Sequence, residues 1–301
     1  MNKGVFYAIG AYVLWGFIPI FFKLLRYVPP MQILAHRFIW SFFFLIFLLY
    51  YFHQFEKIKS TFNKRVIFSY SIAGAVLAIN WGTFIYAVNS GQTIESSFGY
   101  FINPIVSVLL GVVFLKEKLR VMQWIPVFLA TAGVLYLTII FGSIPWIALV
   151  LAFSFGLYGL TKKVFPLESL PSLTLETGAL FIPALLFLII QETRGVGSFG
   201  HIGWSTSILL ASSGVVTAIP LLLFGAGTRK INLSTIGILQ YITPTLQLFV
   251  GVYLFGENFN SHQLIGFILI WIALIVFTIE MVYYQRNKQA EISDLEVTVP
   301  Q

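Results

Sequence analysis

The chain has 301 residues, of which 58% are hydrophobic and only 10% are charged, and its mean hydropathy is +0.89. Water-soluble domains carry roughly 25% charged residues, so this composition excludes a soluble globular protein and indicates one that faces lipid. The net charge of +7 is explained by basic loops of a membrane protein, and we expect no nucleic-acid partner. Cysteine is absent, which excludes disulfides and thiolate chemistry.

Ten segments are long and apolar enough to cross a bilayer, which requires about 20 such residues. They are residues 4–25, 33–53, 67–89, 96–115, 121–141, 144–161, 173–191, 205–228, 234–255 and 262–284. The first segment is longer than a signal peptide and lacks a small-x-small cleavage site, so we expect it to be retained as a span. The polar residues 285–301 follow the last segment as a tail.

The loops between these segments differ in charge. Ten spans place both termini on one side, and the loops of that side hold 14 of the 18 Lys and Arg residues. The loops of the opposite side hold only Arg26 and Arg194. Because Lys and Arg accumulate in cytoplasmic loops, the sequence predicts cytoplasmic N- and C-termini.

Two stretches, residues 98–119 and 239–259, share one pattern. A shift of 140 residues carries Pro104 onto Pro244. The same shift carries Gly111 onto Gly251 and Glu117 onto Glu257. Each copy contains five spans, an odd number, so the second copy must cross the membrane in the opposite sense. The sequence therefore predicts an all-α integral membrane protein of ten transmembrane helices in two inverted-topology five-helix repeats, residues 1–142 and 143–284, followed by a cytoplasmic tail.

Pro104 and Pro244 are expected to break their helices at symmetric positions. A proline inside a span frees a backbone carbonyl and kinks the helix, and in lipid that carbonyl needs a partner or a wet cavity. Two interpretations stay open: the kinks shape a solute cavity, or they are packing kinks satisfied by Ser and Thr neighbours.

Ionisable side chains within spans cost several kcal/mol, about 2.5–3.5 on insertion scales, unless they are paired or wet. Lys23, His36 and Arg37 lie near the predicted outer ends of the first two spans, and Glu95 lies on the same side. We predict a cationic vestibule, partnered by Glu95, that attracts an anionic solute. The alternative is that Lys23 and Arg37 extend to the headgroups and that Glu95 stabilises a helix N-terminus.

Two further carboxylates lie in later spans. Glu176 is expected to pair with Lys162 or Lys163, and a proton-coupling role, which would require its burial, is the alternative. Glu280, near the end of the last span, is expected at the interface close to Arg286.

Polar and aromatic residues near the middle of the spans, Trp15 among them, indicate an aromatic-lined, sparsely polar cavity, which is typical of small-molecule sites. The predicted substrate-binding residues, with the cationic group, are Lys23, His36, Arg37, Asn80, Trp81, Tyr100, Asn103, Tyr158, Gln240 and Tyr241. The chain contains no GxxxxGK[ST] phosphate loop, no HExxH, no nucleophile elbow and no TVGYG-like filter. We therefore expect no enzyme activity, no metal and no other cofactor.

The segments YVLWGFIPIFFKLL, ILAHRFIWSFFF, ESSFGYFINPIVSVLLGVVFLKEKLRVMQW, GSIPWIALVLAFSFGLYGL and LSTIGILQYITPT closely resemble the RarD proteins. These are bacterial permeases of the EamA group in the drug/metabolite transporter superfamily, and the resemblance extends from about Tyr7 to Arg286. It implies the EamA fold of two inverted repeats and an inner-membrane location.

The sequence therefore predicts a bacterial inner-membrane secondary transporter, an exporter of a small metabolite or drug-like solute. Its expected partners are membrane lipid, the solute, and a proton or a counter-solute. The alternatives are a polytopic membrane enzyme or assembly factor, and a channel without a transport cycle. The substrate, the coupling ion and the oligomeric state are not determined by the sequence.

Overall fold

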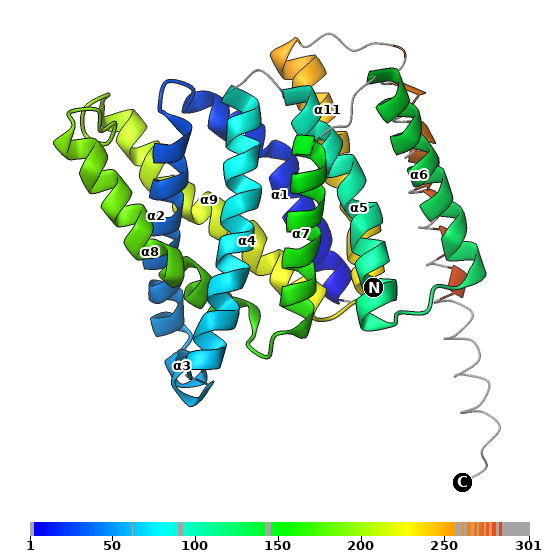
Figure 1. The fold of residues 1–301 in the computed structure, drawn as a ribbon, viewed down its shortest axis with the longest axis horizontal. Helices are drawn as coiled ribbons and strands as arrows, with labels where there is room; N and C mark the ends of the chain where they lie inside the picture. Colours follow the sequence, from blue (N-terminus) through cyan, green and yellow to red (C-terminus); the bar gives the residue numbers. More distant parts are fainter. Residues whose placement is uncertain are drawn as a thin grey trace.

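A computed structural model describes residues 3–61, 63–89, 93–141 and 146–256, together with isolated residues between 261 and 284. All of the regular structure in these residues is helical (Figure 1). The elements are α1 (Lys3–Leu24), α2 (Pro30–Tyr51), α3 (Phe55–Thr61), α4 (Lys64–Asn89), α5 (Thr93–Leu115), α6 (Val121–Phe141), α7 (Trp146–Val164), α8 (Ser169–Thr193), α9 (Trp204–Thr228), α10 (Leu233–Leu239), α11 (Ile242–Phe249) and a π-helix, η1 (Val250–Leu254).

Seven of the described helical segments are long and apolar enough to cross a membrane, and two shorter apolar helices, Gly99–Leu115 and Val121–Tyr136, accompany them. Large apolar side chains such as Phe68, Phe128 and Ile139 are exposed on their outer faces. Such a surface is tolerated by lipid and not by water. The tenth predicted span, residues 262–284, lies largely outside the described residues, as does the tail, residues 285–301.

Helix boundaries recur along the chain at a spacing of 140 residues. Helices α4 and α9 begin at residues 64 and 204, and α5 and α10 begin at residues 93 and 233. The packing recurs as well, because α1 packs on α9 as α7 packs on α4, and α2 packs on α9 as α8 packs on α4. Each of these pairs joins the first half of the chain to the second (Figure 1). The two halves are therefore interleaved rather than laid side by side.

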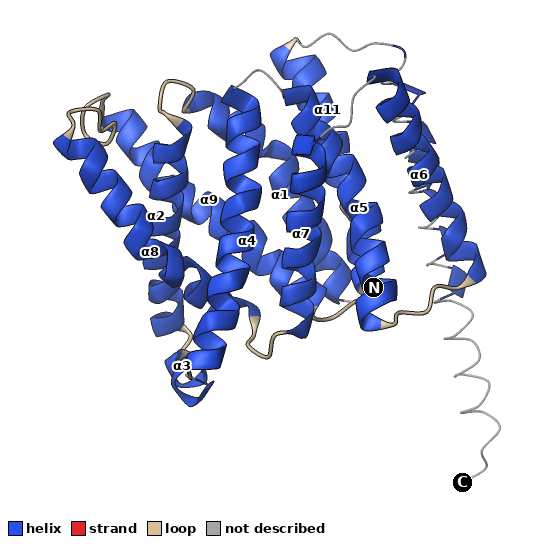
Figure 2. Ribbon diagram, in the orientation of Figure 1, coloured by secondary structure: helices blue, strands red, loops and turns tan. Residues whose placement is uncertain are grey.

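The loops lie at the two ends of the helix bundle (Figure 2). Helix α3 and the connections α5–α6 and α7–α8 are at the lower end, and the α1–α2 and α8–α9 connections are at the upper end. Helix α3, which the sequence analysis did not predict, contains Lys57 and Lys59. Three of the basic loops that the sequence assigned to one side, those around α3, between α5 and α6 and between α7 and α8, thus share one end of the bundle (Figure 1).

The predicted span 234–255 contains the helix break that was expected near Pro244. Its helix is interrupted at Gln240 and Tyr241, between α10 and α11. Pro244 has no N–H to donate to the carbonyl of Gln240, four residues earlier. That carbonyl accepts instead from the N–H of Thr243 at 3.0 Å, in a tighter turn. The break expected at Pro104 in the first half is wrong, because Pro104 lies inside the unbroken α5.

Close helix crossings surround the centre of the bundle. A Cβ added to Gly214 of α9 would lie 2.3 Å from the backbone carbonyl carbon of Trp40 in α2. Only glycine therefore permits this approach of two backbones. Aromatic rings also fill the core: the ring centroids of Trp15 and Phe155 are 5.4 Å apart, and Tyr158 stacks on Phe224 at 6.1 Å.

Candidate functional site

Arg37 is the most deeply buried cation of the candidate site, with 2% of its surface exposed. Its Nε donates a hydrogen bond to Oγ1 of Thr217 at 2.7 Å, and its guanidinium lies over the ring of Trp81, 3.0 Å from the centroid. Within the described part of the chain, Nη1 and Nη2 have no hydrogen-bond partner, and no carboxylate pairs with them. Two donors of a buried charge are thus left unsatisfied, which is costly without a ligand or water.

A cavity of about 10 Å³ lies beside Arg37. Its lining contains three pairs of residues that are 140 positions apart: Arg37 with Thr177, Leu77 with Thr217, and Trp81 with Leu221. Residues that occupy equivalent places in the two halves therefore meet around one small space.

A larger cavity of about 40 Å³ shares Trp81 with the first. It contains two more such pairs, Trp15 with Phe155 and Tyr100 with Gln240. Both cavities are large enough for water but not for an organic solute. A solute can therefore enter only if the surrounding helices move apart.

The polar groups of the larger cavity differ in how well they are satisfied. Nδ2 of Asn80 donates to the carbonyl of Leu151 at 2.9 Å and to Oγ of Ser154 at 3.0 Å. By contrast, Nε1 of Trp15 and Oε1 of Gln240 are buried and have no partner among the described residues. The cavity thus contains at least one free donor and one free acceptor that are fully buried.

The predicted cationic vestibule is not assembled as expected. Lys23 is exposed, and its ammonium group lies 3.6 Å from the centroid of the Phe255 ring. His36 stacks on Phe199 and lines a separate hollow of about 380 Å³ at the upper end. Neither residue lines the cavities around Arg37, because residues at similar depth point from different helix faces. The side chain of Glu95 lies outside what the structure describes.

Three other predicted site residues are engaged in packing rather than in lining these cavities. Nδ2 of Asn103 donates to the carbonyl of Ala152 at 2.8 Å. The hydroxyl of Tyr241 donates to the carbonyl of Phe101 at 3.2 Å, and that of Tyr158 donates to Glu176. These bonds satisfy buried polar groups, and they leave Arg37, Asn80, Trp81, Tyr100 and Gln240 as the predicted residues that the structure brings together.

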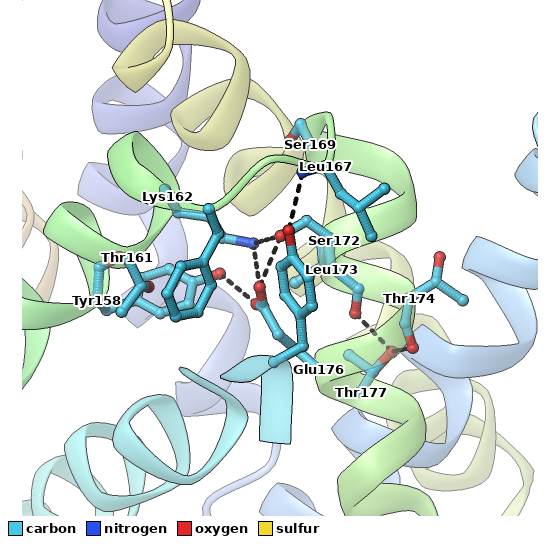
Figure 3. Close-up of polar contacts among 12 residues, drawn as sticks. Tyr158, Thr161, Lys162, Leu167, Ser169, Ser172, Leu173, Thr174, Glu176 and Thr177 are labelled. Carbon is cyan, nitrogen blue, oxygen red and sulfur yellow. Dashed lines mark hydrogen bonds and ion pairs between the residues drawn. The ribbon is translucent and has the colours of Figure 1, made fainter. Parts of the chain in front are cut away.

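A buried ion pair lies next to the smaller cavity in sequence, since Glu176 directly precedes the cavity residue Thr177. Lys162 of α7 and Glu176 of α8 are joined at 2.6 Å, which confirms one of the two predicted partners of Glu176. Figure 3 shows Lys162, Ser172 and Tyr158 converging on this carboxylate. Ser172 donates to Oε1 at 2.8 Å, and Tyr158 donates to Oε2 at 3.0 Å. The charge of Glu176 is therefore both paired and hydrogen-bonded.

Hydrogen bonds at the lower end of the bundle join the two halves and also tie together parts of the second half. Glu117, just beyond α5, accepts the backbone N–H groups of Leu233 and Ser234 at 2.7 and 3.1 Å, and it also accepts the hydroxyl of Ser234. Arg229 donates to the carbonyls of Phe165 and Leu167 at 2.8 and 2.9 Å. These bonds fix the start of α10 to the end of α5 and the end of α9 to the α7–α8 connection.

Glu280 has a partner that the sequence analysis did not name. It binds Arg120 through two hydrogen bonds, of 2.5 and 2.8 Å. The hydrogen bond to Glu280 raises the pKa of Arg120. The expectation that Glu280 lies close to Arg286 remains a prediction, because Arg286 is outside the described residues.

Several cavity residues were missed by the sequence analysis, including Thr217, Phe155 and Thr243. The repeat contained a usable signal, because a shift of 140 residues leads from Trp15 to Phe155 and from Asn103 to Thr243. Among the described residues, no group of three or more His, Cys, Asp or Glu side chains is arranged to hold a metal ion.

Comparison with known proteins identifies the class. The model of the EamA-like transporter family matches residues 2–139 and 143–279. The chain thus belongs to the EamA-like transporter family: it is an all-helical membrane transporter with two EamA domains, and not an enzyme.

Individual relatives agree with this assignment. The chain is 44% identical to the uncharacterized transporter YojE of Bacillus subtilis (strain 168), over 96% of this chain and 98% of that one. It is 41% identical to the RarD protein of Escherichia coli (strain K12), over 95% and 97% of the two chains. A crystal structure of another protein, 17% identical, has the same fold, with a TM-score of 0.67 over 92% of this chain and 98% of that chain.

Proposed function

We propose that this chain is a secondary transporter of the bacterial inner membrane that moves a small anionic solute by alternating access. The transporter would have ten spans in two inverted repeats, with both termini in the cytoplasm. The observation that supports this proposal best is that both central cavities are lined by pairs of residues 140 positions apart. Such pairs can meet only where the symmetry axis of the repeat passes.

The packing agrees with an axis at this position. Equivalent helices contact each other, α2 with α8 and α5 with α10. Phe101 and Tyr241, also 140 positions apart, are joined by a hydrogen bond. In inverted-repeat transporters the axis lies in the membrane plane and the solute binds near the midplane. The two cavities around Trp81 are therefore the proposed solute site.

The chemistry of Arg37 supports an anionic solute. A planar guanidinium with two free nitrogens fits two oxygens of a carboxylate or a phosphate group. Burial of an unpaired charge is costly, and a ligand that neutralises the charge removes this cost. Lys23, which the sequence analysis grouped with Arg37, is not part of the proposed site.

Contacts between the two halves at the lower end support a cycle with two access states. The contacts of Glu117 with Leu233 and Ser234 join the two halves, and they would have to separate before the solute could leave through that end. We infer that this end faces the cytoplasm, because it carries the basic loops. Export as the direction of transport is inferred from the family resemblance.

A stability assay on purified protein tests the anion site. The probes are small carboxylates and phosphates, with neutral amides of the same size as controls. Anions are expected to raise the thermal midpoint of the wild type but not that of Arg37→Gln, while Lys23→Gln responds like the wild type. If anions stabilise Arg37→Gln equally well, or stabilise neither protein, the proposed site is wrong. Counterflow of the active anions in proteoliposomes then separates a transporter from a channel.

Cysteine labelling tests the topology, since the chain has no native cysteine. Lys59→Cys and Lys118→Cys should be shielded from impermeant reagents in intact cells. Tyr27→Cys and Val196→Cys, at exposed positions of the opposite end, should be labelled. Labelling of Lys118→Cys from outside would contradict both the ten-span count and the inverted repeat.

A further inference from the structure

The larger cavity contains a free hydrogen-bond donor and a free acceptor. Trp15 is 9% exposed and Gln240 is 4% exposed, and both side chains line this cavity. Neither Nε1 of Trp15 nor Oε1 of Gln240 has a partner in the described parts of the chain. Buried polar groups are normally satisfied, so two unsatisfied groups on one cavity indicate that a ligand or water binds there.

Packing explains the ring of Trp15 but not its N–H group. The indole lies 5.4 Å from the ring of Phe155 and 5.6 Å from that of Phe224. A phenylalanine would make similar aromatic contacts, and Phe155 is the residue that occupies the place of Trp15 in the second half. Similarly, Gln240 occupies the place of Tyr100. Equivalent positions of the two halves therefore line the cavity, but the side chains at these positions differ in their hydrogen-bonding groups.

The remaining wall indicates that a neutral group binds here. Oγ1 of Thr243 already donates to the carbonyl of Tyr12 at 3.0 Å, and Nε2 of Gln247 donates to the carbonyl of Trp15 at 3.2 Å. No Asp, Glu, Lys or Arg is among the described residues that line this cavity. A charged group would lack a counter-charge there, whereas a hydroxyl or a carboxamide would satisfy the free donor and the free acceptor together.

Arg37 and the larger cavity are separated by a single aromatic layer. Trp81 and Phe22 line the cavity, and the guanidinium of Arg37 lies 3.0 Å and 4.9 Å from the centroids of their rings. We propose that Trp15 and Gln240 form a neutral hydrogen-bonding subsite that selects anions carrying a hydroxyl or carboxamide group. This inference rests on the proposed function, because Arg37 must hold the anionic end of the same solute.

Three acids of equal size test the subsite. Succinamate has a carboxamide at its second end, 4-methylpentanoate has two methyl groups there, and succinate has a second negative charge. Thermal midpoints of the purified full-length protein are measured as each acid is titrated. Succinamate should have the lowest half-saturating concentration, by about two- to tenfold, which is the value of one or two neutral hydrogen bonds.

Matched variants assign this preference to the two residues. Trp15→Phe and Gln240→Leu should lose the preference for succinamate while keeping the response to 4-methylpentanoate. Trp204→Phe, which changes an exposed tryptophan outside the cavity, should behave like the wild type. The unchanged response to 4-methylpentanoate distinguishes a lost hydrogen bond from a misfolded protein.

Each other outcome contradicts a defined part of the reasoning. If succinamate and 4-methylpentanoate stabilise the wild type equally and both effects vanish in Arg37→Gln, the anion site stands and the neutral subsite is wrong. If succinate is preferred, the subsite is not neutral. If none of the three acids stabilises the wild type, both the subsite and the anion site are wrong.

Discussion

The buried ion pair between Lys162 and Glu176 gives the largest stability effect that the structure predicts. The two side chains are 3% and 1% exposed, and Nζ lies 2.6 Å from Oε1. Substitution of Lys162→Met removes the counter-charge but leaves the carboxylate with two neutral donors, Ser172 and Tyr158. Neutral donors do not replace a counter-charge in a buried site.

The expected loss can be bounded by comparison with an exposed pair. Removing one partner of a buried ion pair costs about 3–5 kcal/mol. Lys57 and Glu168 form a pair that is 46% and 59% exposed, and such surface pairs contribute about 0–1 kcal/mol. Lys162→Met should therefore lower the free energy of unfolding several-fold more than the control Lys57→Met.

The assay is reversible unfolding in mixed micelles, with a double-mutant cycle. In Lys162→Met/Glu176→Gln neither charge remains, so most of the lost free energy should return. Two results would refute the reasoning. One is a loss in Lys162→Met no larger than that in Lys57→Met; the other is a double variant whose loss equals the sum of the two single losses.

Three further predictions concern a helix crossing, a capping contact and the solute site. Gly214→Ala should lower the free energy of unfolding by about 1–3 kcal/mol, because the added Cβ would overlap the backbone of α2 and overpack the crossing. Gly82→Ala, which has open space around it, should raise the free energy of unfolding by about 0.5–1 kcal/mol through its higher helix propensity. Glu117→Ala should lower the free energy of unfolding by about 1–3 kcal/mol, because it removes the acceptor of the N–H groups at the start of α10. The control Lys118→Ala, at the exposed neighbouring residue, should leave the free energy of unfolding unchanged. Arg37→Met should be at least as stable as the unliganded wild type in thermal melts, since it removes an unpaired buried charge, and a large loss would show that Arg37 is structural.

Much of the fold was predictable because bilayer thickness and duplication leave strong traces in a sequence. Apolar length alone identified nine segments that each overlap described helices, and the spacing of 140 residues between Pro104 and Pro244 anticipated the recurrence of helix boundaries. A break was expected at both prolines, and only the one near Pro244, at Gln240, is present. It depends on how the chain satisfies the carbonyl that Pro244 leaves free, and two equivalent prolines have different outcomes in α5 and after α10.

The site was less predictable, because sequence gives the depth of a residue in a span more readily than the direction of its side chain. Lys23 and Arg37 were placed at similar depth, yet one is exposed beside Phe255 and the other is buried against Trp81. Likewise, Tyr158 and Asn80 were both placed near the midplane, and of the two only Asn80 lines one of the two central cavities. The direction of a side chain depends on the rotation of its helix about the helix axis, and tertiary packing sets this rotation. A lipid-facing helix is apolar on most faces, so its amphipathic pattern indicates the rotation only weakly.

Residues 140 positions apart in the two halves meet near the centre of the molecule and have different surroundings towards its ends. Residues on the proposed symmetry axis, such as Arg37 and Thr177, line one space, so in an alternating-access cycle the same groups would contact the solute whichever half has moved. Away from the axis, Glu176 is equivalent to His36, and the ion pair of Glu176 at one end corresponds to aromatic stacking of His36 at the other. A transporter built in this way would have a common binding site but two chemically different gates. The gate with the buried ion pair would open only when the contacts of both charges are replaced, and it is therefore expected to be the slower of the two.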